Sequence, residues 1–154
     1  GGNTILQAYR DSRVKALVTL AGVENFGNRF PKKERLAEYK AKGVFYVENG
    51  RTKQQMPHYY QFYEDYINHE KELNIQFAAQ HLKKPYLIVH GTTDEAVSLK
   101  SAMLLHDWVK TSELLQIEGA NHTFGGREPW NEDNLPIDLL FVVESVTKYL
   151  FKNI

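Results

Sequence analysis

Two short stretches of the sequence decide the predicted fold: residues 89–94, VHGTTD, and residues 118–124, EGANHTF. Each stretch follows a short apolar run, and such a run next to turn residues is typical of a buried strand. We therefore expect Asp94 and His122 on loops just beyond the carboxyl ends of two parallel strands. A carboxylate and an imidazole placed in this way can serve as the orienting acid and the general base of a nucleophilic triad.

The apolar pattern predicts a parallel sheet covered by helices. Three runs, residues 14–21, 86–89 and 113–117, are apolar on both faces, as expected of parallel strands that are buried on both sides. Ser98 can cap a helix between the second and third strands, and apolar residues recur at helical spacing over residues 139–150. This alternation of strands and helices favours an α/β fold.

The segment of residues 22–81 interrupts this alternation and is too long for a simple crossover. Pro31 suits the first turn of a helix that ends near Gly43. Residues 44–48 are expected to form a strand, and Asn49-Gly50 a tight turn of a small hairpin. Pro57 precedes a tyrosine-rich stretch, residues 59–66, that predicts a further helix. We expect one domain with this segment inserted into it.

The motifs together resemble the carboxyl-terminal half of an α/β-hydrolase, in the dienelactone-hydrolase-like or serine-peptidase-like group. Residues 90–97 resemble the family's H-G-x-x-D-x-x-V stretch, and residues 119–124 its G-x-x-H segment. Gly1-Gly2 resembles the segment after the serine of the G-x-S-x-G elbow, which would place that serine two residues before Gly1. The resemblance implies a single partial α/β-hydrolase domain, residues 1–154, whose insertion at residues 22–81 is a cap or lid.

The resemblance also implies the chemistry. Asp94 would be the acid and His122 the base of a serine hydrolase that cleaves a carboxylic ester or related small acyl substrate through an acyl-enzyme. The nucleophile and the oxyanion hole would lie outside this chain, in the missing amino-terminal half of the same fold. Three alternatives stay open: an amide or peptide substrate, the cysteine nucleophile of dienelactone hydrolases, or a non-catalytic fragment that binds a ligand or partner under the cap. The residue two positions before Gly1 would separate them, since a serine, an aspartate and a glycine or alanine imply different chemistry.

Several other residues are weaker candidates. Glu24 follows the first predicted strand and is a distant second choice for the acid. His90 is expected to hold its loop by hydrogen bonding rather than to react. The aromatic residues at 59–66 can line an apolar pocket, although such spacing is more often packing, and Trp130 can flank that pocket. The remaining histidines lack the spacing of a metal site and are expected on the surface or in packing: His58, His69, His81 and His106.

Composition excludes several classes of function. Nineteen basic and nineteen acidic residues balance among 154, which argues against binding to nucleic acid or to an anionic membrane surface. No apolar run is long enough to cross a bilayer. Without cysteine, this chain holds no disulfide, zinc–thiolate site or cysteine nucleophile. We expect no cofactor or metal and a cytoplasmic location, and a homo-oligomer is left open. The first predicted strand should carry an unpaired edge, which predicts insolubility of this chain alone or pairing with another polypeptide.

Overall fold

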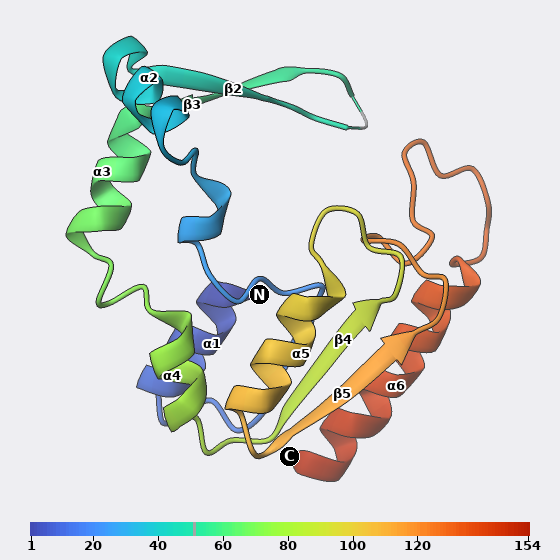
Figure 1. Ribbon diagram of the computed structural model, residues 1–154. Helices are drawn as coiled ribbons and strands as arrows, with labels where there is room; N and C mark the ends of the chain where they lie inside the picture. Colours follow the sequence, from blue (N-terminus) through green and yellow to red (C-terminus); the bar gives the residue numbers. More distant parts are fainter. Residues whose placement is uncertain (51) are drawn as a thin grey trace. The chain divides into compact units, whose positions relative to one another are not determined.

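The computed structural model describes residues 1–50 and 52–154, which form two compact units. The larger unit comprises Gly1–Glu24 and Ile75–Ile154, and the smaller unit is Asn25–Asn74. Figure 1 traces both units along the chain. The larger unit holds both motifs and all three predicted parallel strands, so it is the part of the chain that positions the candidate site.

The larger unit is built on a parallel sheet of three strands in the order β1-β4-β5. The strands are β1 (Leu17–Leu20), β4 (Tyr86–Gly91) and β5 (Ser112–Ile117). Every residue of the central strand β4 is buried, as expected for a strand with neighbours on both edges and helices on both faces. The predicted α/β class and the parallel sheet are therefore confirmed.

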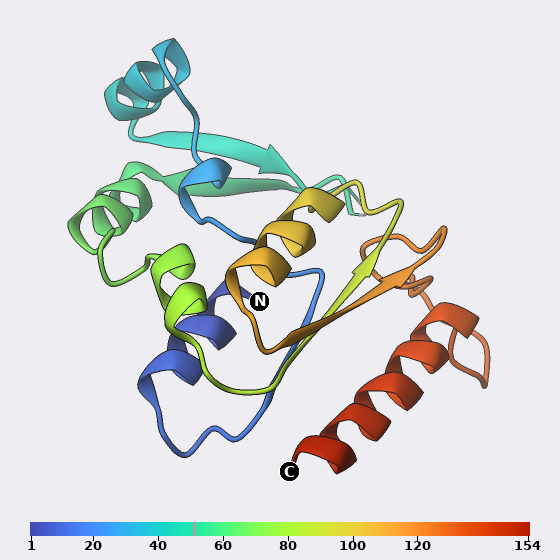
Figure 2. The same ribbon diagram turned by 60° about the horizontal axis from the view of Figure 1, so that its bottom comes forward.

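Helices cover both faces of this sheet. Three of them lie on one face: α1 (Gly2–Arg10), α4 (Ile75–His81) and α5 (Leu99–Trp108). The fourth, α6 (Ile137–Asn153), lies on the opposite face, as Figures 1 and 2 show. The apolar spacing over residues 139–150 thus correctly predicted a helix that packs on the sheet.

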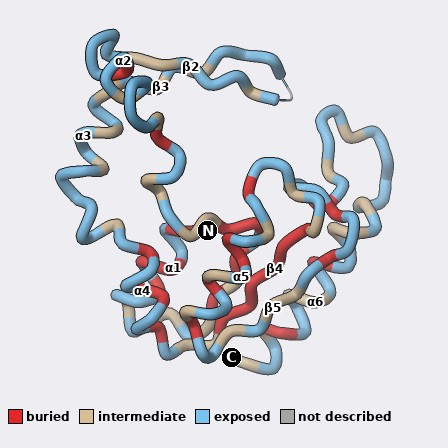
Figure 3. The backbone as a smooth tube through the Cα atoms, in the orientation of Figure 1, coloured by how far each residue is buried: buried red, intermediate tan, exposed pale blue. Residues whose placement is uncertain are grey.

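The hydrophobic core lies between the sheet and these helices, where Figure 3 shows the buried segments of the chain. On the α6 side, Val89 and Ile117 pack in one cluster with Val142 and Tyr149. Fully burying an apolar side chain of this size contributes roughly 1.5–3 kcal/mol. The core therefore fixes both strands at the point where they lead into the two motif loops.

A polar pair is buried on the other face of the sheet. The Oγ1 atom of Thr19 lies 2.7 Å from the hydroxyl of Tyr86, which satisfies both groups away from water. Burial raises the pKa of Tyr86, so its phenol stays neutral and can share this hydrogen bond. The pair joins β1 to β4 across the sheet.

Strand β1 is shorter than predicted, because only Leu17–Leu20 pairs with β4. The N–H of Leu17 bonds to the carbonyl of Pro85, where β4 has not yet begun, so residues 14–16 have no ladder to join. Leu20 is 45% exposed, although burial on both faces was expected. Because Leu17 and Thr19 are buried, the exposure is confined to the other face of β1, which is, as predicted, an edge strand of the sheet.

The α5 helix begins as predicted. Ser98 is its N-cap, and its side-chain oxygen accepts a hydrogen bond from the N–H of Lys100. A serine in this place satisfies one of the N–H groups that the first turn leaves without a helical partner. The cap fixes the direction of the chain directly after Asp94 and Val97.

The smaller unit contains two longer helices, a 3-10 turn and a two-stranded antiparallel sheet. In chain order these elements are η1 (Gly27–Arg29), α2 (Glu34–Lys42), β2 (Val44–Glu48), β3 (Gln55–Tyr59) and α3 (Tyr60–Asn68). Both predicted helices and the predicted hairpin are present. The role of this unit as a cap over the site stays a prediction, as do the bounds of the insertion, residues 22–81.

Two local predictions in the smaller unit were wrong. Pro31 does not begin the helix, which starts at Glu34 after Lys33 adopts a positive φ of 53°. Gly43 does end this helix, with a φ of 71° that favours glycine. Asn49-Gly50 does not close the hairpin as a two-residue turn, because β2 ends at Glu48 and β3 begins only at Gln55.

Two general features bear on function. No helix among the described residues is long and apolar enough to cross a membrane. Within the same residues, no three side chains of histidine, cysteine, aspartate or glutamate gather in a way that could hold a metal ion.

Candidate active site

The two motif loops lie side by side because they come after neighbouring strands and cross at a glycine. Gly91 pairs with Ile117 as the last position of the β4–β5 ladder. A Cβ atom on Gly91 would lie 2.2 Å from the carbonyl oxygen of Ala120, so a side chain here would collide with the backbone of the histidine loop. Glycine therefore permits the close approach of the loop that carries Asp94 to the loop that carries His122.

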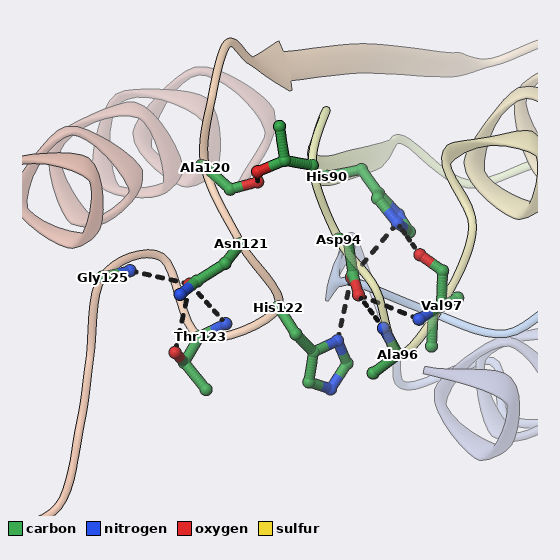
Figure 4. Close-up of polar contacts among 10 residues, drawn as sticks. His90, Asp94, Ala96, Val97, Ala120, Asn121, His122, Thr123 and Gly125 are labelled. Atoms are coloured by element: carbon green, nitrogen blue, oxygen red, sulfur yellow. Dashed lines mark hydrogen bonds and ion pairs between the residues drawn. The ribbon is translucent and has the colours of Figure 1, made fainter. Parts of the chain in front are cut away.

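His122 and Asp94 meet across these loops, as Figure 4 shows. The Nδ1 atom of His122 lies 2.9 Å from Oδ2 of Asp94, which is hydrogen-bond distance. The carboxylate side chain is fully buried, whereas the imidazole is 44% exposed. The structure thus brings both predicted site residues together, with the acid inside the protein and the histidine at its surface.

The Asp94 carboxylate is held by three hydrogen bonds. Oδ1 accepts from the N–H groups of Ala96 and Val97, both at 2.8 Å, and Oδ2 accepts from His122. Burial by itself raises the pKa of Asp94, but the bonds from Val97, His122 and Ala96 outweigh it, so the pKa is lowered overall. The acid is therefore ionised near neutral pH and can only accept hydrogen bonds.

An ionised Asp94 determines which nitrogen of His122 carries the proton. Because the carboxylate accepts, Nδ1 of the neutral ring must be the protonated nitrogen, which leaves the lone pair of Nε2 free. An imidazole in this tautomer can take a proton at Nε2, and the buried negative charge stabilises the imidazolium that results. The arrangement is chemically suited to general base catalysis.

His90 supports the acid from the buried side. Its ring is fully buried, and Nε2 lies 2.8 Å from the carbonyl oxygen of Val97 and 3.3 Å from Oδ2 of Asp94. Since a carbonyl can only accept, His90 donates from Nε2, while Nδ1 has no hydrogen-bond partner among the described residues. The backbone of Val97 is therefore held on both sides of its Cα atom, at the N–H by Asp94 and at the carbonyl by His90. The prediction that His90 holds its loop is confirmed.

Asn121 shapes the turn that carries His122, although the sequence pattern did not single it out. Its Oδ1 accepts from the N–H and the hydroxyl of Thr123 and from the N–H of Gly125, at 3.0–3.1 Å. Phe124 then adopts a positive φ of 52° and is buried in the core under α6. The signal that could have identified Asn121 is the known tendency of asparagine to bond to the backbone two residues onward.

Gly1 lies against the loop after β1. A Cβ atom on Gly1 would lie 2.4 Å from Cα of Gly22, so the backbones at these two positions are in direct contact. Gly1 is the N-cap of α1, and β1 ends at Leu20. A glycine is thus needed where α1 begins, next to the carboxyl end of the neighbouring strand.

The weaker candidates lie elsewhere. The carboxylate bonded to His122 is that of Asp94, not that of Glu24. In the smaller unit, aromatic rings from residues 59–66 pack on Phe30, whose centroid lies 5.2 Å from the ring centroids of Phe62, Tyr63 and Tyr66. This supports the packing interpretation of these aromatics.

The other candidates have local contacts. Trp130 donates from Nε1 to the carbonyl of Asn134, and its place beside a pocket stays a prediction. Four histidines contact nearby aromatic, backbone or hydroxyl partners, as expected of surface or packing residues: His58, His69, His81 and His106.

No family model matches this sequence, and no curated protein matches it. Solved structures do resemble its fold. The esterase domain of a Rhodothermus marinus protein has a TM-score of 0.62 at 15% identity, over 96% of this chain and 55% of that one. Est1E from Butyrivibrio proteoclasticus has a TM-score of 0.61 at 18% identity, over 99% and 57%. A monoacylglycerol lipase from Paleococcus ferrophilus has a TM-score of 0.57 at 18% identity, over 97% and 65%.

These similarities identify the fold as that of an α/β-hydrolase, of which the chain represents a carboxyl-terminal part. The chain spans a little over half the length of the first two structures that it resembles. At identities below 20% the resemblance concerns the fold, and function depends on the site itself. The dienelactone-hydrolase-like subgroup has no support from these structures.

Proposed function

We propose that this chain provides the acid and the base of a serine hydrolase of the α/β type, which cleaves a carboxylic ester or related acyl substrate. The observation that carries the proposal is the bond of 2.9 Å between His122 Nδ1 and a buried, ionised Asp94. A histidine held in this tautomer presents an unprotonated nitrogen, which is required for activation of a hydroxyl nucleophile.

In the proposed reaction, His122 Nε2 takes the proton of a serine hydroxyl while the serine oxygen attacks the carbonyl carbon of the ester. The imidazolium then gives this proton to the leaving alkoxide, and an acyl-enzyme forms. Water repeats the sequence: His122 takes its proton, hydroxide attacks the acyl carbon, and the proton returns to the serine oxygen. Asp94 keeps its negative charge throughout and stabilises each imidazolium.

The serine itself is proposed to lie two residues before Gly1. The close contact of Gly1 with Gly22 supports this placement, because the elbow resemblance requires a glycine there, next to the neighbouring strand. The oxyanion donors would also lie outside this chain, at the residue after the serine and in a more upstream loop. The smaller unit, Asn25–Asn74, is proposed to be the cap of the site.

The test is ester hydrolysis by the intact protein that contains this chain. Short-chain activated esters are suitable substrates, and a feruloyl ester can be added because one structure of the fold neighbour Est1E holds ferulic acid. His122→Ala should remove nearly all turnover, whereas His106→Ala, which changes an exposed histidine on α5, should keep it. Wild-type turnover in the His122 variant would reject the proposal, and the absence of turnover in the wild-type protein would favour the ligand-binding alternative. Cleavage of amides in place of esters would favour the peptidase or amidase alternative.

A further inference from the structure

Two threonines join the acid loop to the histidine loop through their side chains. The hydroxyl oxygen of Thr92 accepts a hydrogen bond of 2.8 Å from the N–H of Gly119. The hydroxyl of Thr93 donates toward two carbonyl oxygens, that of Gly119 at 2.9 Å and that of Ala120 at 3.0 Å. We refer to Thr92 and Thr93, with the Gly119–Ala120 backbone that they bind, as the threonine clamp.

The threonine clamp begins where the sheet ends. The β4–β5 ladder stops at Gly91 and Ile117, and the N–H of Thr92 still reaches the carbonyl of Ile117 at 3.0 Å. Beyond this bond the ladder no longer holds the chains together, because Gly119 turns away with a φ of 72°. The two hydroxyls, with the backbone bond from Thr93 N–H to Ala120, then connect the loops up to two residues before His122.

We propose that Thr92 and Thr93 are positioning residues that hold His122 against Asp94. The imidazole is 44% exposed, so water competes for Nδ1 and the pairing depends on how firmly the histidine loop is held. A displacement of about 1 Å would break the bond of 2.9 Å, and misplacement on that scale can cost about 10²-fold in rate. The catalytic consequence rests on the proposed function, whereas the effect on the His122–Asp94 pair does not.

The experiment compares a variant that removes the two hydroxyl groups with a variant that keeps them. Thr92→Val with Thr93→Val keeps the branched shape but removes both hydroxyls, and Thr92→Ser with Thr93→Ser keeps them. Thr111→Val is the matched control, since Thr111 donates to the carbonyl of Lys84 at 2.7 Å near the amino end of β5, away from the site. This control removes a threonine hydrogen bond of the same kind without touching either motif loop.

Two quantities are measured on the intact protein: the solvent exchange rate of the His122 Nδ1 proton by NMR, assigned by its loss in His122→Ala, and ester turnover. The double valine variant should raise the exchange rate at least about tenfold and lower kcat by about 10- to 100-fold, with KM changed little. In the double serine variant, Thr92→Ser with Thr93→Ser, and in Thr111→Val, the exchange rate and kcat should stay within about threefold of wild type. This is the scale of a single exposed hydrogen bond.

The proposal would be overturned if the double valine variant kept the wild-type exchange rate. It would also be overturned if Thr111→Val changed the exchange rate as much as the double valine variant does, because the effect would then be general destabilisation. A failure of the proposed function would look different. In that case the wild-type protein would show no ester turnover, or His122→Ala would retain it, while proton exchange at Nδ1 would still report how the clamp acts on the His122–Asp94 pair.

Discussion

Replacing Asp94 by asparagine probes the tautomer of His122 with almost no change in shape. Oδ1 of Asp94 accepts from the N–H groups of Ala96 and Val97. In Asp94→Asn the amide oxygen must keep this place, so the amide NH₂ group faces Nδ1 of His122. Because NH₂ donates, Nδ1 becomes the acceptor, the proton moves to Nε2, and the ring can no longer accept a proton from a nucleophile.

The size of the effect is set by the cost of the opposite amide orientation. Turning the amide around would leave two N–H groups facing NH₂, at about 1–3 kcal/mol for each unsatisfied donor, or about 2–6 kcal/mol together. At about 1.4 kcal/mol per tenfold, kcat should fall by about 30-fold to about 10⁴-fold. His90 donates from Nε2, which lies 3.3 Å from the position of Oδ2. This donor disfavours an NH₂ group at that position, so the expected loss of kcat lies toward the lower end of the range.

The assay is kcat for a short-chain activated ester, measured on the intact wild-type protein and on Asp94→Asn. Circular dichroism and thermal unfolding are recorded alongside, since the isosteric change should leave the fold intact. A loss of kcat of only about threefold or less in a folded variant would refute the tautomer argument. The smallest loss expected from the two backbone donors is about 30-fold.

Three further predictions concern stability. Gly91→Ala should cost about 1–3 kcal/mol in urea unfolding, because the new Cβ would meet backbone atoms of Ala120 that cannot rotate away; unchanged stability would show that the loops can separate freely. The pKa of Asp94 in the folded protein lies below its ordinary value of 3.8, so the ionised carboxylate stabilises the fold above about pH 4, and this contribution is lost as the pH falls further. The free energy of unfolding should therefore decline more steeply from pH 5 to pH 3 in wild type than in Asp94→Asn. Parallel curves for the two proteins would contradict this. His90→Leu should lose about 1–3 kcal/mol by leaving the Val97 carbonyl unpaired, whereas His90→Gln can restore a donor; equal losses in thermal unfolding would exclude the hydrogen bond as the cause.

The sequence predicted the strands and the proximity of Asp94 and His122 because these depend on local patterns. Apolar runs identified β4 and β5, and the residues just after such runs lie at one edge of a parallel sheet. That rule predicts that Asp94 and His122 lie near each other. The first residue of β1, Leu17, could not be predicted in the same way, because it depends on where the partner strand β4 begins, at Tyr86.

Other features were missed because they join residues far apart in the sequence. The Thr92 and Thr93 side chains bond to backbone 26 or 27 positions away, and no local pattern marks such partners. Asn121 acts locally and was missed although asparagine commonly shapes turns. The hairpin turn was placed too early, because Asn49-Gly50 has the composition of a two-residue turn while the pairing of Glu48 with Gln55 requires a longer connection.

Covalent labelling of the nucleophile tests the central claim most directly. The intact protein is treated with a serine-directed phosphonate, and the labelled residue is located by peptide mass spectrometry in the wild type and in His122→Ala. We predict one labelled serine, two residues before Gly1, with labelling strongly reduced when His122 is absent, since the hydroxyl then lacks its base. Label on a different residue, equal labelling without His122, or ester hydrolysis by a protein that takes up no label would contradict the assignment of Asp94 and His122 as the acid and base of a serine hydrolase.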